Sequence, residues 1–245
     1  MNVICNLQTR IIIICFIFLI IETWTLQPPL QLRELSVSSS SFSEIPNSLS
    51  HLQHLEKFKL IGFESSALPE EFCFSRSLQY LELKYSYDLQ RLPDSFGNLR
   101  NLKSISLKKC IRLEVLPDSI GYLSELQRIN LDGCKSLEVL PNALETLTNL
   151  REINLSGCKK LKMLPKFYHN LINSQAIILA GCKSLEMLPN SIGELTNLQE
   201  INVDSVDSKC LDLHIVRVES SSCFSTALHT LCVPVDEYPG VHSIF

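Results

Sequence analysis

Residues 126–149 read LQRINLDGCKSLEVLPNALETLTN, and the chain repeats this sequence pattern at a nearly fixed interval. The same pattern of Leu, Ile, Cys and Pro starts at Leu102 and again at Leu150 and Ser174. Units begin at residues 32, 55, 78, 102, 126, 150, 174 and 198, so the interval is 23 or 24 residues. A fixed period of this length is the sequence signature of a repeat architecture.

Each unit contains two kinds of apolar spacing. The first half alternates, as in Ile129-Asn-Leu131, which predicts a short one-sided strand. The second half spaces its apolar residues by three and four after a proline, as from Pro141 to Leu147, which predicts a short helix. One unit cannot bury its apolar face alone, so neighbouring units are expected to stack and share a core. We predict an α/β solenoid of about seven to eight units over residues 26–205, with a curved parallel sheet on the concave face and short helices or turns on the convex face.

Units such as residues 129–142, INLDGCKSLEVLPN, look like leucine-rich repeats. The Gly-Cys-Lys-Ser-Leu wording, followed by Leu-Pro-x-Ser-Ile-Gly-x-Leu, resembles the repeat region of plant nucleotide-binding disease-resistance proteins of the TIR type over residues 32–205. That resemblance implies innate immune sensing, in which the repeats bind pathogen molecules or hold a switch inactive. The chain departs from the family because it has no Gly-x-x-x-x-Gly-Lys-Ser/Thr motif, so a nucleotide is not expected as a ligand.

Composition excludes several other function classes. The 22 basic and 26 acidic residues give a net charge of −4 with no basic run, which argues against nucleic-acid binding. Ten cysteines in 245 residues are too sparse for a small disulfide scaffold. No Gly-x-Ser-x-Gly or His-Glu-x-x-His motif occurs, and the six histidines are scattered without a ligand set. We therefore expect no catalytic residue, no metal and no cofactor.

Residues 1–25 differ in composition from the repeats. The run Ile11–Ile21 holds eleven apolar residues, which as a helix would extend about 16 Å, half of the hydrocarbon core of a bilayer. This length is typical of a signal peptide or an uncleaved signal anchor. We expect entry into the secretory pathway or membrane association through residues 11–21. A cytoplasmic chain, in which the segment is a buried strand or helix at the end of the solenoid, is the alternative.

The end of the chain breaks the repeat. Val206 stands where the preceding units have Cys, and residues 206–245 no longer follow the period. Because the terminal units of a solenoid need an atypical outer face, we expect a C-terminal cap or an irregular tail over residues 206–245.

Four cysteines recur at intervals of 24 residues and are the most suggestive cluster for chemistry: Cys110, Cys134, Cys158 and Cys182. In stacked units they would lie about 4.8 Å apart in a row, so four of them span about 14 Å and cannot surround one metal with bonds of about 2.3 Å. Their Cβ atoms would run side by side instead of facing each other, which disfavours disulfides. We predict a buried structural ladder, with redox chemistry between neighbours as the alternative.

The polar positions between the buried strand residues are the candidate binding surface, because they point out of the concave face. A mixed-charge surface of this kind suits a protein partner better than a small molecule. We expect the partner over the later units, centred on Ile178 between Ala176 and Ala180, with Glu152 and Arg128 one and two coils away as a charged rim. The predicted contact residues are Arg128, Asn130, Asp132, Glu152, Asn154, Ala176, Ile178, Ala180, Glu200 and Asn202.

These patterns predict a non-enzymatic protein–protein interaction module of the plant disease-resistance type, acting in defence or pathogen recognition. The alternative is a membrane-tethered or secreted repeat scaffold with no immune role.

Overall fold

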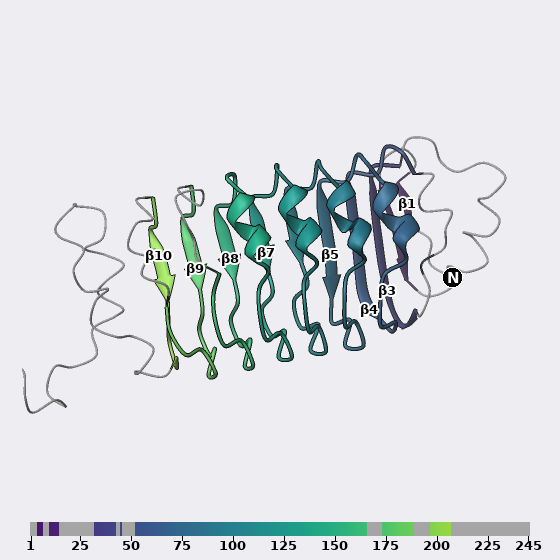
Figure 1. Ribbon diagram of the computed structural model, residues 1–245. Coiled ribbons are helices and arrows are strands. Elements are labelled where there is room, and N and C mark those ends of the chain that lie inside the picture. The colour runs from purple at the N-terminus through teal and green to yellow at the C-terminus, as the bar shows by residue number, and fades with distance from the viewer. Residues whose placement is uncertain are drawn as a thin grey trace, which may run out of the picture.

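A single row of strands runs through the whole described part of the protein. The computed structural model describes residues 4–6, 10–14, 32–42, 45, 52–165, 173–188 and 197–206. Their strands form one ten-stranded sheet in which spatial order follows chain order, and only β1 is antiparallel to its neighbour (Figure 1). The strands are β1 (Ile4–Asn6), β2 (Arg10–Ile14), β3 (Glu34–Phe42), β4 (Lys57–Phe63), β5 (Tyr80–Lys84), β6 (Ser104–Ser106), β7 (Arg128–Asn130), β8 (Glu152–Asn154), β9 (Ala176–Ile178) and β10 (Glu200–Asn202).

The register of the parallel strands matches the repeat. Ile129 pairs with Ile153, and Ile153 pairs with Ile177, so equivalent residues of successive units lie side by side. In each of these short strands the central residue is buried and its two neighbours are not, as the alternating pattern predicts. The predicted parallel-sheet solenoid is confirmed.

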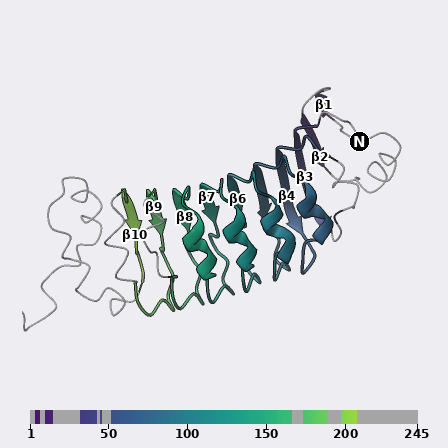
Figure 2. The same ribbon diagram turned by 45° about the horizontal axis from the view of Figure 1, so that its top comes forward.

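Short 3-10 helices line the opposite side of the solenoid. They are η2 (Glu70–Phe74), η3 (Asp94–Asn98), η4 (Asp118–Tyr122) and η5 (Asn142–Thr146), and they stack in a row beside the sheet (Figure 2). Pro117 precedes η4 with φ of −69°, a torsion that its ring imposes and that suits the start of a helix. The N–H of Ile120 then donates to the carbonyl of Pro117 at 3.0 Å, and that of Leu123 to Ile120 at 3.1 Å. The apolar spacing of three therefore matches i→i+3 hydrogen bonds, and the predicted short helices are of the 3-10 type.

The turn after each strand explains the Gly-Cys wording of the repeat. Gly133 and Gly157 have φ of 76° and 67°, in the left-handed region that glycine adopts at low cost. The earlier coils place Tyr85 and Lys109 at the equivalent position, with φ of 57° and 64°. The left-handed turn is therefore also present in coils where a residue other than glycine precedes the repeated cysteine or its equivalent.

One hydrophobic core runs the length of the described solenoid. Leucines at the repeated positions, such as Leu131, Leu155 and Leu179, are fully buried. Aromatic side chains fill the earlier coils, where the Phe58 and Phe72 rings lie with centroids 5.2 Å apart. The core therefore changes from aromatic-rich to leucine-rich along the chain.

The structure describes only part of the two terminal segments predicted at residues 1–25 and 206–245. Arg10 and the first four residues of the apolar run form β2, which pairs in parallel with β3. Among the described helices, none is long and apolar enough to cross a bilayer. The rest of the run, from Cys15, and the predicted cap beyond Val206 lie outside the described residues. The signal-segment and cap assignments stay predictions.

Candidate functional site

The sheet face opposite the 3-10 helices is the surface that the sequence predicts to be concave, and we call it the open face. Strand register brings the predicted contact residues into columns that cross β7 to β10. The first two columns follow from paired residues, because Arg128 pairs with Glu152 and Asn130 with Asn154, and the pairing continues through β9 to β10. The columns are Arg128, Glu152, Ala176 and Glu200; then Asn130, Asn154, Ile178 and Asn202; then, just after each strand, Asp132, Ser156, Ala180 and Asp204. All twelve side chains are half-buried or exposed.

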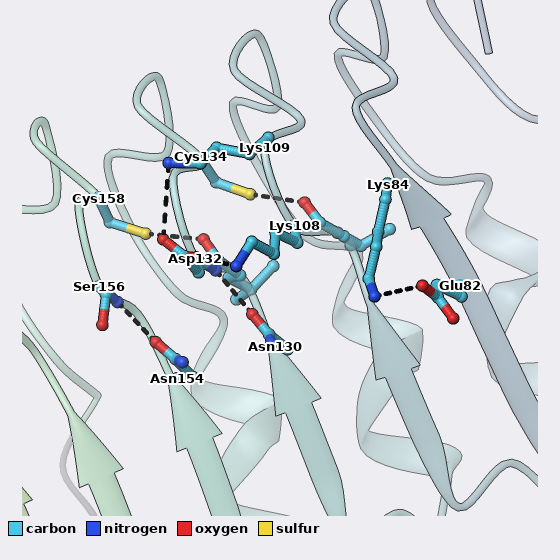
Figure 3. Close-up of polar contacts among 12 residues, drawn as sticks. Glu82, Lys84, Lys108, Lys109, Asn130, Asp132, Cys134, Asn154, Ser156 and Cys158 are labelled. Carbon is cyan, nitrogen blue, oxygen red and sulfur yellow. Dashed lines mark hydrogen bonds and ion pairs between the residues drawn. The ribbon is translucent and has the colours of Figure 1, made fainter. Parts of the chain in front are cut away.

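The asparagines of the second column hold the backbone that follows their own strands. The Oδ1 atom of Asn130 accepts a hydrogen bond from the N–H of Asp132 at 2.9 Å, and Asn154 does the same for Ser156 at 2.9 Å (Figure 3). Asn202 accepts from the N–H of Asp204 at 3.0 Å. These asparagines lie on the predicted binding surface and also have a structural role. The structural role was not predicted from the sequence.

Ile178 interrupts this column. It pairs in register with Asn154 on one side and Asn202 on the other, and its side chain is half-buried. Ala176 and Ala180, which flank it, are also half-buried. The structure thus places the three residues of the predicted apolar notch next to one another on the open face.

Charges on the earlier coils of the open face are paired within the protein. Glu82 forms ion pairs with Lys59, at 3.4 Å, and with Lys84. Lys108 contacts Asp132 at 2.9 Å, and this hydrogen-bonded ion pair raises the pKa of the Lys108 ammonium (Figure 3). These side chains satisfy one another, so they offer less free charge to a partner.

The later coils differ in this respect. No ion pair within the described part of the chain involves Arg128, Glu152, Glu200 or Asp204. The predicted surface over β7 to β10 therefore carries charges that have no ionic partner among the described residues.

The repeated cysteines lie in the core, and their thiols are not cross-linked. Cys110, Cys134, Cys158 and Cys182 are free and fully buried. Burial raises the pKa of the Cys110 thiol to about 12 and that of Cys182 to about 11, and it also raises the pKa of Cys134 and Cys158. Thiols held protonated in this way are poor nucleophiles and poor metal ligands.

Within the residues that the structure describes, no group of three or more His, Cys, Asp or Glu side chains is arranged to hold a metal ion.

An exposed apolar column on the flank of the solenoid was not predicted. Its members recur two residues before the repeat proline and are Val115, Val139, Met163 and Met187. Met163 forms isolated parallel bridges with Val139 and Met187, so the column is a minimal second sheet. This column could have been found from the apolar residue that precedes each Leu-Pro pair. That residue belongs neither to the alternating strand pattern nor to the helix pattern of the repeat.

Comparison with known proteins supports the fold over most of the chain. A family model described as Leucine Rich Repeat matches residues 31–52. Among curated proteins, none matches this sequence. A leucine-rich-repeat protein of Leptospira interrogans has a similar structure, with 29% identity and a TM-score of 0.65 over 76% of this chain and 45% of that one. The chain therefore spans less than half of the length of that protein.

More distant structures share the fold alone. The leucine-rich-repeat domain of the type III effector XopL is 23% identical with a TM-score of 0.57, over 72% of this chain and 70% of that one. Drosophila Toll, solved with Spatzle, is 18% identical with a TM-score of 0.55, over 80% and 30%. The Arabidopsis receptor kinase HAESA, solved with the peptide hormone IDA and SERK1, is 24% identical with a TM-score of 0.53, over 70% and 29%. The repeated sequence, the solenoid that it builds, the repeat matched at residues 31–52 and the similar Leptospira structure show that the chain has the fold of a leucine-rich-repeat protein.

Proposed function

We propose that this chain is a non-enzymatic interaction module that recognises a protein partner on the open face over β7 to β10. The observation that carries the proposal is a set of charges with no ionic partner among the described residues, placed around an apolar notch on that face, with Glu152 and Glu200 on either side of Ala176. An apolar centre inside a polar rim is the anatomy of protein interfaces. The paired charges of the earlier coils make that half of the face a weaker candidate.

The fold neighbours support a protein as the ligand class. Toll and HAESA were each solved as complexes, with Spatzle and with the peptide hormone IDA. A broad sheet face also suits a protein or peptide better than a small molecule, which needs a concave apolar pocket of a few hundred Å³.

The finer part of the proposal is a role in plant defence. It rests on the Gly-Cys-Lys-Ser-Leu sequence at residues 133–137, which resembles the repeats of plant disease-resistance proteins. Loss of the gene should then change the growth of a pathogen in infected tissue. Unchanged growth across a panel of bacterial, fungal and oomycete pathogens would contradict the defence role and leave the binding role standing.

The binding role is tested by Ile178→Asp, which puts a charge at the centre of the notch. Tagged wild-type and variant chains are used to capture partners from the tissue that expresses the protein, and captured proteins are identified by mass spectrometry. The variant should keep its melting temperature within a few degrees and lose the partners. Tyr122→Asp, on the exposed side of η4 and far from the sheet face, is the matched control and should keep them.

A second candidate function is a membrane-tethered or secreted scaffold without an immune role, and the apolar run Ile11–Ile21 favours it. N-terminal sequencing of the mature protein, combined with cell fractionation, separates the two. Cleavage near residue 25 or recovery in the membrane pellet supports the scaffold, whereas an intact cytosolic chain supports the immune-type module.

A further inference from the structure

The interruption of the asparagine column at Ile178 leaves a backbone donor without its usual acceptor. In the coils of Asn130, Asn154 and Asn202, the N–H two residues later donates to the asparagine Oδ1 at 2.9, 2.9 and 3.0 Å. The equivalent donor in the interrupted coil is the N–H of Ala180, and an isoleucine side chain cannot accept it. No described residue accepts a hydrogen bond from this N–H.

The neighbouring backbone fixes the position of this N–H. The N–H groups of Leu179 and Gly181 both donate to the next coil, to the carbonyls of Asn202 and Asp204, at 2.7 Å each. Ala180, between them, is at the position whose N–H meets an asparagine side chain on the open face in the other three coils. The Ala180 N–H is therefore a surface donor held in place on both sides.

Among the coils of β6 to β10, one other lacks the asparagine, and its surroundings are different. Ser106 stands in the column there, and the N–H of Lys108 has no acceptor among the described residues. The Lys108 ammonium and the Asp132 carboxylate form an ion pair beside it at 2.9 Å. Within the described coils of β6 to β10, the available donor lies among apolar side chains only at Ala180, beside Ala176 and Ile178.

The charges around the notch are acidic. Glu152 and Glu200 lie one coil to either side of Ala176, and Asp204 lies one coil beyond Ala180, in the part of the face where described residues supply no ionic partner. Two described basic side chains lie on the β7 and β8 side of the notch: Arg151, just before β8, and Arg128, two coils from Ala176. The described charges of the rim on the β10 side are thus acidic, those of Glu200 and Asp204.

We propose that the notch binds an extended peptide segment of the partner, with an apolar side chain between two basic ones. This assignment rests on the proposed function and names the chemistry of the partner. A backbone carbonyl of the segment accepts the hydrogen bond of the Ala180 N–H, and the apolar side chain covers Ala176 and Ile178.

The spacing of the basic side chains follows from strand geometry. In an extended segment, residues two apart project from the same side about 6.6 Å from one another. Glu152 and Glu200 are two coils apart, about 9.6 Å at one strand spacing of about 4.8 Å per coil. Lysines two positions before and two positions after the apolar residue are about 13 Å apart, so each long side chain has to lean inward by about 2 Å to reach its carboxylate.

The test uses the blocked peptide Ac-Lys-Ser-Leu-Ser-Lys-NH2 and the full ¹⁵N-labelled chain. During an NMR titration to millimolar peptide, the Ala180 amide proton should move downfield as it gains the carbonyl acceptor. Replacing the leucine by serine, or both lysines by glutamate, should weaken binding at least fivefold. Absence of a shift at Ala180, or equal binding of all three peptides, overturns the proposal.

Ile178→Asn is the decisive variant because it restores the asparagine that caps the N–H in the other coils. It should keep the melting temperature, protect the Ala180 amide from hydrogen exchange and weaken the peptide at least tenfold. Ser106→Asn makes the matching change in the other coil and should leave the peptide affinity unchanged.

The outcome also separates this proposal from the proposed function. A natural partner captured by wild type and by Ile178→Asn, but lost with Ile178→Asp, would keep the open face as the binding surface and reject the peptide assignment.

Discussion

The thiol of Cys134 donates a hydrogen bond to the carbonyl oxygen of Leu107 in the preceding coil, with 3.2 Å between sulfur and oxygen (Figure 3). The contact repeats along the solenoid, from Cys158 to Leu131 at 3.3 Å and from Cys182 to Leu155 at 3.1 Å. Each thiol thus satisfies a buried carbonyl of the coil before it, which explains why a weak donor of small volume recurs there. The cysteines link neighbouring coils without a covalent bond.

The buried thiols make stability depend on alkaline pH. In the unfolded chain a cysteine ionises near pH 8.5, roughly, whereas burial raises the pKa of Cys110 to about 12 in the folded protein. Above the unfolded pKa, the unfolded chain has lost a proton that the folded chain still holds, so the free energy of unfolding falls as pH rises toward the folded pKa. Below the unfolded pKa the contribution of the protonated thiol is fully present.

The expected size of this effect is about 1.4 kcal/mol per pH unit for each thiol, between the two pKa values. Urea unfolding measured at pH 8, 9, 10 and 11 gives the slope. Cys110→Ala removes one thiol, so it should reduce the slope by about 1.4 kcal/mol per pH unit. The other side chains are the same in both proteins, so their contributions cancel in the comparison. A slope that does not change in the variant would mean that Cys110 ionises freely in the folded chain.

Ser86 occupies the ladder position in the coil before Cys110, and the substitution Ser86→Cys should stabilise the protein. Ser86 is fully buried, and its hydroxyl has no hydrogen-bond partner among the described residues. A thiol costs less to bury than an unpaired hydroxyl, so we expect a gain of about 1 kcal/mol in the free energy of unfolding. Thermal and urea melts measure it. Ser86→Ala, which also removes the hydroxyl, is the companion variant. A loss of stability in both variants would show that the Ser86 hydroxyl stabilises the folded protein, against this prediction.

Much of the fold could be predicted because the repeat carries two independent patterns. Alternation fixed which strand residues are buried, and the constant period fixed the register, so that Ile129 was expected beside Ile153 and is paired with it. The proline before each helix marked its start, as at Pro141 and η5. Periodic signals of this kind average over many units, which makes an error at one unit harmless.

Features without a period were harder to foresee. The Ile11–Ile14 stretch has no alternation, so its composition alone fits a helix, a signal segment or the strand β2 that the structure describes. The asparagine column looked like a surface feature, because a sequence pattern does not say that Asn154 accepts from the N–H of Ser156. Such local side-chain to backbone bonds depend on the torsions of the turn, which composition does not report.

The stacking of the 3-10 helices depends on glycine in η4. A Cβ atom at Gly121 would lie 2.7 Å from the carbonyl oxygen of Ala143 and 2.8 Å from the hydroxyl of Thr146, both in η5. Gly121→Ala should therefore push the two coils apart and lower the free energy of unfolding by about 1–3 kcal/mol. Glu145 holds the equivalent place in η5, is half-buried and already carries a Cβ atom there, so Glu145→Ala is the matched control and should change the melting temperature little. Equal melting temperatures for the two variants would show that the helices are not in this contact.

Leu155 tests the register of the whole solenoid. Its side chain is fully buried, as are the equivalent leucines of the neighbouring coils, Leu131 and Leu179. Leu155→Ala should cost ~2–5 kcal/mol through lost burial and the cavity that remains. Cys134→Ser should cost less, because the hydroxyl replaces a thiol of similar size and can still donate to Leu107.

The adjacent residue supplies the control for this prediction. Ser156 is on the open face and half-buried, so Ser156→Ala should leave the urea midpoint nearly unchanged while Leu155→Ala shifts it strongly. Because each coil contacts only its neighbours, hydrogen exchange in Leu155→Ala should rise first in the coils that begin at Leu126, Leu150 and Ser174. If instead Ser156→Ala destabilises the protein and Leu155→Ala does not, the strand residues face the opposite way and the binding surface proposed above lies inside the core.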